Sequence, residues 1–143
     1  MLRLGPGARL AVFTAREAAE RCGRLSVPEV RAPLDLGALV AGWPPGRRLL
    51  VCAEWGTARP IAEALGAAAR EESDAPWAVM TGPEGGFAQS ELDALRDLPF
   101  VTPVGLGPRL LRADTAALAA LACWQAVLGD GRSRPPGHAP AES

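Results

Sequence analysis

Three short apolar runs constrain the fold of this 143-residue chain more than any other feature. They occupy residues 49–53, 77–81 and 100–104, and their length is typical of strands that are buried on both faces. Segments with the length and composition of helices follow them in turn, at 61–70, 90–98 and 115–128. The first starts just after Pro60, and at the start of the second Ser90 with Asp93 resembles a capping box. This alternation predicts an α/β fold with a mostly parallel sheet flanked by helices, because parallel strands need long crossover connections.

The two ends of the chain are expected to add to this pattern. Before the first run, the sequence predicts a lead segment over 1–7, a helix over 8–21, a short strand over 27–30 and a helix over 34–41. After Gly129, a stretch rich in Pro and Gly predicts a disordered tail over 130–143. We therefore expect one domain over 8–129.

The residue types that are absent exclude several kinds of chemistry. All 15 cationic side chains are arginines, and the single histidine, His138, lies in the expected tail. Without lysine, the chain cannot form a Schiff base or use a P-loop lysine. Without a placed histidine, it lacks a Ser-His or Cys-His nucleophile pair and an HExxH zinc motif, so we expect no metal site. The net charge of -1 argues against a polybasic nucleic-acid-binding arm.

The cysteine pattern and the hydropathy indicate the cellular compartment. Cys22, Cys52 and Cys123 are odd in number and form no CxxC motif, so we expect buried thiols in a reducing cytosol. No run reaches the ~18 apolar residues of a membrane-spanning helix. The N-terminus also lacks the apolar core of a signal peptide. These observations predict a cytoplasmic protein with no membrane partner.

The three predicted strands each end in a glycine-bearing loop. These loops are Ala-Glu-Trp-Gly at 53–56, Thr-Gly-Pro-Glu-Gly-Gly-Phe at 81–87, and the segment 104–112. Ligands bind at the carboxyl ends of strands in open α/β sheets, and glycines let the backbone approach them. The Gly105-Leu106-Gly107 sequence does not fit a dinucleotide-binding site, because position 110 is Leu where the third glycine would stand. Taken alone, the segment 82–86 is equally consistent with a simple tight turn.

Two of these segments together resemble a known family. Gly-Pro-Glu-Gly-Gly-Phe at 82–87, followed by Leu-Gly-Pro-Arg-Leu-Leu-Arg-Ala-Asp-Thr-Ala at 106–116, is similar to the RsmE family of 16S ribosomal RNA uracil-N3 methyltransferases. The upstream segments 17–24 and 27–30 match the same family. The resemblance implies a SPOUT-type α/β trefoil knot, S-adenosylmethionine as the methyl donor, a uridine of small-subunit ribosomal RNA as the substrate, and a role in ribosome biogenesis.

The resemblance also implies the residues of the site. The residues that would bind the cofactor come from all three loops: Ala53, Glu54, Thr81, Gly82, Pro83, Glu84, Gly85, Gly86, Leu106, Gly107, Leu110 and Leu111. The leucines would enclose the adenine, and backbone groups would bind its edge.

Two charged residues are the candidates for catalysis. Arg112 would stabilise the N3-deprotonated uracil, although it could equally be a helix-start arginine that pairs with Asp114 or Glu84. Glu84 could be a general base, although a carboxylate in a glycine turn more often accepts backbone N–H bonds. Thr115 is expected to cap the last helix.

The last predicted helix, 115–128, is apolar nearly all round, so we expect it to be buried on most sides. The resemblance implies that it packs against the same helix of a second copy in a homodimer. Members of the family also carry an N-terminal PUA-like RNA-binding domain and a first strand and helix, which we expect this chain to lack. The alternative function is therefore a non-catalytic knotted module that dimerises and binds S-adenosylmethionine but has lost RNA binding.

Overall fold

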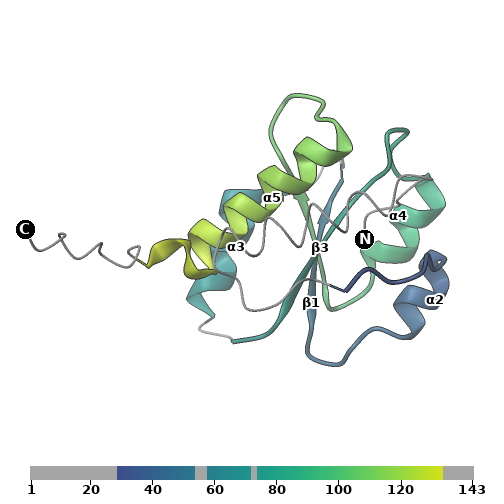
Figure 1. The fold of residues 1–143 in the computed structure, drawn as a ribbon, viewed down its shortest axis with the longest axis horizontal. Coiled ribbons are helices and arrows are strands. Elements are labelled where there is room, and N and C mark those ends of the chain that lie inside the picture. Colours follow the sequence, from purple (N-terminus) through teal and green to yellow (C-terminus); the bar gives the residue numbers. More distant parts are fainter. Residues whose placement is uncertain (1–28, 54–57, 72–73, 134–143) are drawn as a thin grey trace, which may run out of the picture. The chain divides into compact units, whose positions relative to one another are not determined.

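The computed structural model describes residues 29–53, 58–71 and 74–133 (Figure 1). The chain divides into two compact units, residues 1–43 and 44–143, and each unit is considered by itself. The helix expected over 8–21 and the lead over 1–7 lie outside the described residues. Of the strand expected over 27–30, Glu29 and Val30 are described, and they have no regular secondary structure.

In the first unit, the described residues form one short helix, α2 (Leu36–Ala41). Asp35 lies at its N-cap, where the carboxylate Oδ1 accepts a hydrogen bond from the backbone N–H of Ala38 at 2.8 Å. This bond satisfies one of the free N–H groups at the start of the helix. The helix expected over 34–41 therefore begins two residues later, because Asp35 caps it.

The second unit is built on a four-stranded sheet in which every pair of neighbouring strands is parallel. The strands are β1 (Arg48–Cys52), β2 (Arg59–Pro60), β3 (Trp77–Thr81) and β4 (Val101–Gly105). Their order across the sheet is β2-β4-β1-β3. The three apolar runs thus form the three long strands, and the parallel α/β fold predicted from their alternation is confirmed.

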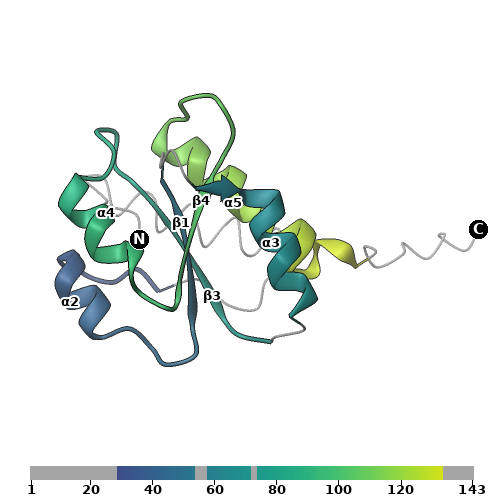
Figure 2. The same cartoon turned by 180° about the vertical axis from the view of Figure 1, so that it is seen from behind.

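Helices cover both faces of this sheet. They are α3 (Ile61–Arg70), α4 (Gln89–Arg96) and α5 (Ala113–Val127), followed by a 3-10 turn at Asp130–Arg132. Figures 1 and 2 show α3 and α5 side by side on one face of the sheet and α4 on the other face. This arrangement follows from the strand order. The chain crosses through α3 from β2 at one edge of the sheet to β3 at the other edge, and it returns through α4 to β4. Because the two crossovers run in opposite directions and both are right-handed, α3 and α4 lie on opposite faces.

The core of this unit lies around β1. Leu49, Leu50 and Val51 are completely buried, as expected for a central strand with helices on both faces. Helix α3 contributes its apolar stripe, in which the buried residues Ile61, Ala64, Leu65 and Ala68 recur with helical spacing. The described residues contain no helix that is long and apolar enough to cross a membrane.

Four sequence-based expectations for this unit are wrong in detail. The strand β2 was not expected. Helix α4 is capped not by Ser90 but at Ala88, whose N–H donates to the Glu91 carboxylate at 2.8 Å.

Helix α5 buries fully only Ala120, whereas Leu118 is 71% exposed and Leu121 is 48% exposed. The tail expected to be disordered from 130 begins with a 3-10 turn, and its remainder, 134–143, lies outside the described residues.

Candidate ligand site at the carboxyl ends of the strands

The carboxyl ends of the three long strands lie at one level of the sheet. Cys52, the last residue of β1, is in register with Thr81 at the end of β3 and with Val104 near the end of β4. Two segments that are distant in sequence, 82–87 and 105–112, leave the sheet at this edge. The parallel register alone therefore brings the second and third glycine-bearing loops together.

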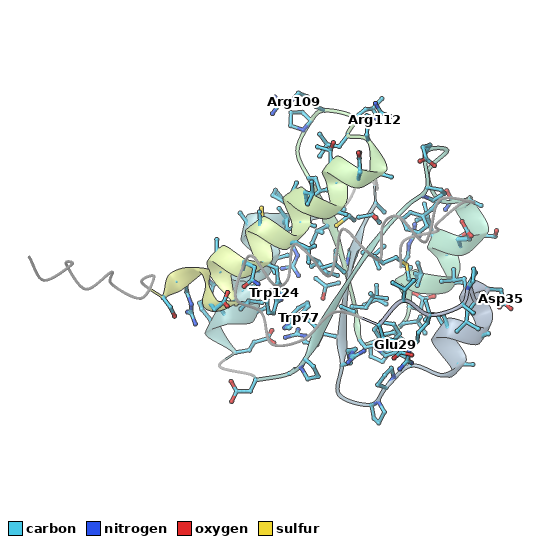
Figure 3. The ribbon with its side chains drawn as sticks, viewed as in Figure 1. Glu29, Asp35, Trp77, Arg109, Arg112 and Trp124 are labelled. Carbon is cyan, nitrogen blue, oxygen red and sulfur yellow. The ribbon has the colours of Figure 1, made fainter. Side chains whose placement is uncertain are left out.

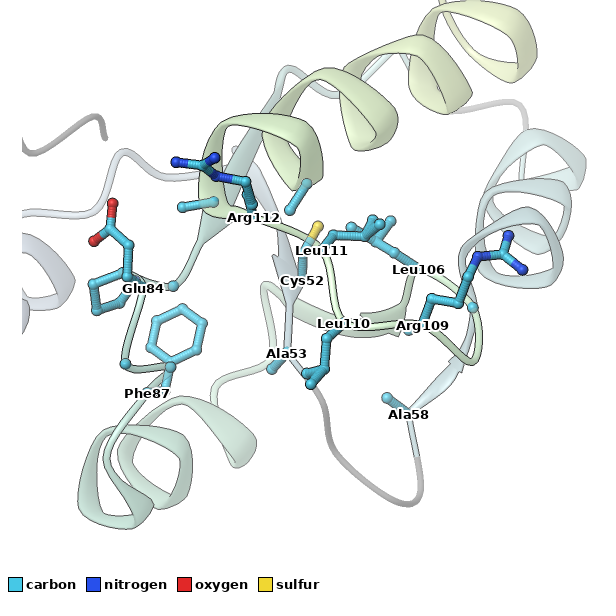
Figure 4. A pocket seen from close by; sticks show the side chains of 18 of the residues that line it. Cys52, Ala53, Ala58, Glu84, Phe87, Leu106, Arg109, Leu110, Leu111 and Arg112 are labelled. Carbon is cyan, nitrogen blue, oxygen red and sulfur yellow. The ribbon is translucent and has the colours of Figure 1, made fainter.

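These loops line a pocket with a volume of about 1060 Å³ (Figure 4). Its walls are the β3–α4 loop, the β4–α5 loop and the ends of β1 and β2. The lining residues from the two loops are Gly82, Pro83, Glu84, Gly85, Gly86, Phe87, Leu106, Gly107, Pro108, Arg109, Leu110, Leu111 and Arg112.

The β3–α4 loop forms one wall of the pocket and turns sharply. The backbone N–H of Gly86 donates to the carbonyl of Pro83 at 2.8 Å, and Gly86 has a φ of 75°, which side-chain-bearing residues rarely adopt. Gly85 does not have a positive φ, and a Cβ placed on it would meet no described atom within 4 Å. The protein itself therefore leaves the space beside Gly85 open.

The β4–α5 loop forms the opposite wall. Gly107 has a φ of 106°, so this turn also needs a glycine. The side chain of Leu106 packs against the hydrophobic core, whereas Leu110 is 83% exposed. The loop therefore presents apolar side chains to the pocket from a wall that is partly anchored in the core.

Two charged side chains, Glu84 and Arg112, line the pocket from opposite loops (Figure 4). In the part of the chain that the structure describes, Arg112 forms no ion pair with Glu84 or Asp114. Arg112 does stand at the start of helix α5, as the alternative interpretation expects, but the described structure does not contain the pairing with either carboxylate. Asp114 instead accepts a hydrogen bond from the backbone N–H of Thr115 at 2.8 Å.

Thr115 is not the cap of the last helix. Helix α5 begins at Ala113, so Thr115 lies within its first turn, and the N-cap position is occupied by Arg112. The Thr115 hydroxyl lies 3.4 Å from the Asp114 carboxylate, with which it interacts instead.

The end of β1 supplies a thiol to the pocket. Cys52 lines the pocket and is 9% exposed. Burial, with a smaller contribution from the Cys123 thiol, raises the pKa of the Cys52 thiol to about 12. The thiol is therefore protonated at neutral pH and is not a nucleophile, because nucleophilic attack requires the thiolate.

The structure places the sequence-predicted residues as follows. Ala53 and the predicted residues of the β3–α4 and β4–α5 loops line the pocket together with Arg112. Thr81, the last residue of β3, is not among the lining residues, and Glu54 lies outside the described residues.

The lining residues that sequence reasoning missed are of two kinds. Some stand within the loops already singled out: Gly105, Pro108, Arg109 and Phe87. Others come from helices or from neighbouring chain segments: Cys52, Ala58, Pro60, Leu92, Ala113 and Ala116. Nothing in the local sequence marks the second kind, because the pairing of the strands and the packing of the helices bring them to the pocket.

This fold and pocket define a class of protein: an α/β domain with a candidate ligand site at the carboxyl edge of a parallel sheet, lined by glycine-bearing loops. The family model described as the RNA methyltransferase domain matches residues 11–125. The chain belongs to this RNA methyltransferase domain family.

Similar proteins agree with this assignment. The chain is 39% identical over 116 residues to ribosomal RNA small subunit methyltransferase E of Synechocystis sp., an alignment that covers 78% of this chain and 36% of that protein. Among solved structures it is similar to ribosomal RNA small subunit methyltransferase E from Neisseria gonorrhoeae bound to S-adenosyl methionine. That match has a TM-score of 0.69 and 29% identity, and covers 92% of this chain and 53% of that one.

A second solved structure is a methyltransferase from Legionella pneumophila in complex with the cofactor SAM. Its TM-score is 0.63 and its identity 26%, over 88% of this chain and 50% of that one. The chain thus spans about a third of the length of the Synechocystis relative and about half of the length of these two solved structures.

Proposed function

We propose that this chain holds the methyl donor S-adenosylmethionine and directs its methyl group to N3 of a uridine in small-subunit ribosomal RNA, in the cytoplasm. One observation carries the proposal: the segments 82–87 and 106–116, which resemble the RsmE family in sequence, contribute residues to opposite walls of one pocket. The structural relatives bound to S-adenosylmethionine at 26% and 29% identity support it. The trefoil knot that the resemblance implies is part of this proposal.

The residues present fit this cofactor. The open space beside Gly85 is a cradle that a Cβ would fill, so the backbone there is accessible to a ligand. Leucine side chains supply the apolar surface that an adenine needs. Both glycine-bearing loops line the pocket, so their backbone N–H and C=O groups are the candidates to bind its polar edge. We propose that Ala53, Glu54, Thr81, Gly82–Gly86, Leu106, Gly107, Leu110 and Leu111 hold it.

When bound, S-adenosylmethionine supplies a methyl group that its sulfonium already activates. The chain therefore needs no covalent nucleophile, which agrees with the protonated state of Cys52 at neutral pH. What remains for the protein is to orient the two reactants, and orientation alone contributes several kcal/mol to such reactions.

The charges at the pocket provide the polar part of the proposed mechanism. Arg112 forms no ion pair with Glu84 or Asp114 in the described part of the chain, so its guanidinium remains available for negative charge that develops on the uracil. Glu84 accepts none of the hydrogen bonds found among the described residues, so its carboxylate is available to accept the N3 proton. We assign these two roles to Arg112 and Glu84.

The proposal includes a homodimer that forms through α5. Leu118 and Leu121 lie three residues apart on this helix and are both exposed, and adjoining exposed apolar side chains are typical of an interaction surface. A second copy would cover this apolar face. Leu118→Asp is expected to shift the chain from a dimer to a monomer in sedimentation experiments. A wild-type chain that sediments as a monomer would contradict the dimer, and a dimer that Leu118→Asp leaves intact would contradict an interface through α5.

A binding titration tests the cofactor site. Gly85→Ala and Gly85→Val are expected to weaken S-adenosylmethionine binding progressively in calorimetry, since each added side chain takes ligand space and meets no protein atom. The matched control is Gly66→Ala on α3, where a Cβ also meets nothing within 4 Å. Equal affinity of wild type and Gly85→Val would refute the site.

A methyl-transfer assay tests the reaction itself. Labelled donor is incubated with small-subunit ribosomal RNA, with and without a separately supplied RNA-binding domain. The proposal is supported if the label is transferred to uridine N3 and if Arg112→Ala reduces this transfer without changing the affinity for the donor. Donor binding with no transfer under either condition would favour the non-catalytic module instead.

A further inference from the structure

We propose that Phe87 is a positioning residue, which holds the β3–α4 loop in the shape that binds the cofactor; this inference rests on the proposed function. Phe87 follows the glycine turn and is half-buried. Its ring lies at the inner side of the loop, between Glu84 and helix α4 (Figure 4).

The ring closes the stem of the loop by packing on Gly82. A Cβ placed on Gly82 would lie 3.1 Å from both Cδ2 and Cε2 of Phe87, which is closer than nine in ten real contacts of a Cβ. The first and last residues of the segment 82–87 therefore touch, and they touch closely only because residue 82 has no side chain. Gly82 and Phe87 form a matched pair.

Few other interactions among the described residues fix the loop. Within the segment the backbone makes the turn bond from Gly86 to Pro83, and just beyond it the Ala88 N–H donates to Glu91 at the start of α4. The turn bond sets the local shape of the loop, and the Ala88 bond fixes where the loop joins the helix. The stacking of Phe87 on Gly82 is what sets the position of the turn relative to the end of β3.

This contact matters for binding because the open backbone at Gly85 lies between the two partners in sequence. A loop that is held in its bound shape loses less conformational entropy when the ligand arrives. If the Phe87 ring is removed, the turn keeps its internal bond but gains freedom to move away from the opposite wall. The ligand must then order the loop, and its affinity falls.

The matched pair makes a specific experiment available. Phe87→Ala and Gly82→Ala are each expected to weaken S-adenosylmethionine binding by at least about tenfold in calorimetric titrations, because small displacements of a preorganised site are costly. In the double variant the added methyl group enters the space that the ring has left, so its affinity is expected to exceed that of Gly82→Ala alone. Phe87→Leu is expected to retain most of the affinity, since a branched apolar side chain still covers Gly82.

Thermal unfolding of each variant separates positioning from folding, and Gly66→Ala on α3 serves as the control. Losses that simply add in the double variant, or equal affinities of wild type and Phe87→Ala, would overturn the role of Phe87. Failure of the wild-type chain to bind S-adenosylmethionine would instead refute the proposed function, so the two failures are distinguishable.

Discussion

The guanidinium of Arg48 lies over the ring of Trp77, with its Cζ 4.7 Å from the ring centroid. The two residues are partners in the register of β1 and β3, at the amino ends of these strands. Arg48 also donates to the Glu71 carboxylate at 2.6 Å. The pocket is at the opposite, carboxyl edge of the sheet, and Figure 3 shows Trp77 far from Arg109 and Arg112. Stability and ligand binding can therefore be perturbed separately.

The contact between Arg48 and Trp77 predicts a loss of stability without a loss of binding. Arg48→Ala is expected to lower the free energy of unfolding by about 1 kcal/mol, since it removes a cation–π contact and a partly exposed ion pair. Urea unfolding measures this loss, and a cofactor titration of the same variant should match wild type. Glu71→Gln removes only the ion pair and should cost less; an equal cost would show that the ring contact contributes nothing.

Helix α3 contains a glycine that the fold does not need. Gly66 lies inside the helix, and a Cβ there would meet nothing within 4 Å. Gly66→Ala is expected to raise the free energy of unfolding by about 0.5–1 kcal/mol, because alanine loses less conformational entropy in a helix. Chemical denaturation measures the change. A destabilised variant would mean that the helix packs more tightly at this point than the structure shows.

The end of helix α5 needs its glycine for a steric reason. A Cβ on Gly129 would lie 2.9 Å from the Gln125 Cα and from the Trp124 Cζ3, and would also collide with the Gln125 side-chain oxygen. Gly129→Ala is therefore expected to destabilise the chain by about 1–3 kcal/mol, as other overpacked sites do. The midpoint of thermal unfolding should fall in this variant and rise in Gly66→Ala. If both alanine substitutions raise the midpoint of thermal unfolding, or both lower it, this steric explanation is wrong.

The buried thiol of Cys52 predicts how stability depends on alkaline pH. The folded chain raises the pKa of this thiol from 9.0 to about 12, so between these values the unfolded chain releases a proton that the folded chain keeps. The unfolded state thus binds fewer protons, and the free energy of unfolding must fall as the pH rises from about 9 toward 12. Below pH 9 this contribution is fully present.

The composition of the chain leaves few other groups that could change the free energy of unfolding in this pH range. The chain has no lysine and no tyrosine, so cysteines are the only side chains expected to titrate in this window. Urea unfolding of wild type and Cys52→Ala at several pH values tests the prediction, and the variant should show a shallower fall. Parallel pH profiles for the two proteins would assign the effect to another group.

The local sequence predicted those parts of the fold that depend on local patterns. The three apolar runs became β1, β3 and β4 with boundaries shifted by one residue or not at all, because a strand buried on both faces has a distinctive composition. Helix α3 was predicted in full, since Pro60 precedes a segment with regular apolar spacing. The two-residue strand β2 has no such pattern; it exists because Arg59 and Pro60 lie beside the end of β4.

Helix ends were predicted less well, because caps depend on which polar group the folded backbone brings near. Ser90 was a plausible cap for α4, yet Glu91 provides the capping carboxylate from inside the helix. In α5, the apolar composition predicted burial on most sides, whereas the position of the helix on the sheet leaves Leu118 and Leu121 exposed. The amount of surface that a helix buries is decided by its neighbours rather than by its own residues.

By itself, the sequence determined the class of fold, the two glycine-bearing loops and the absence of lysine-dependent chemistry, because composition and periodicity act over a few residues at a time. Only the tertiary structure decided that these loops meet, since the parallel register of Cys52 with Thr81 and Val104 brings them to one edge of the sheet. It likewise decided that Phe87 packs on Gly82 and that Arg112 is free of Glu84 and Asp114 among the described residues. The sequence determines which chemical groups are present in a site, whereas the packing of the fold determines the distances between them.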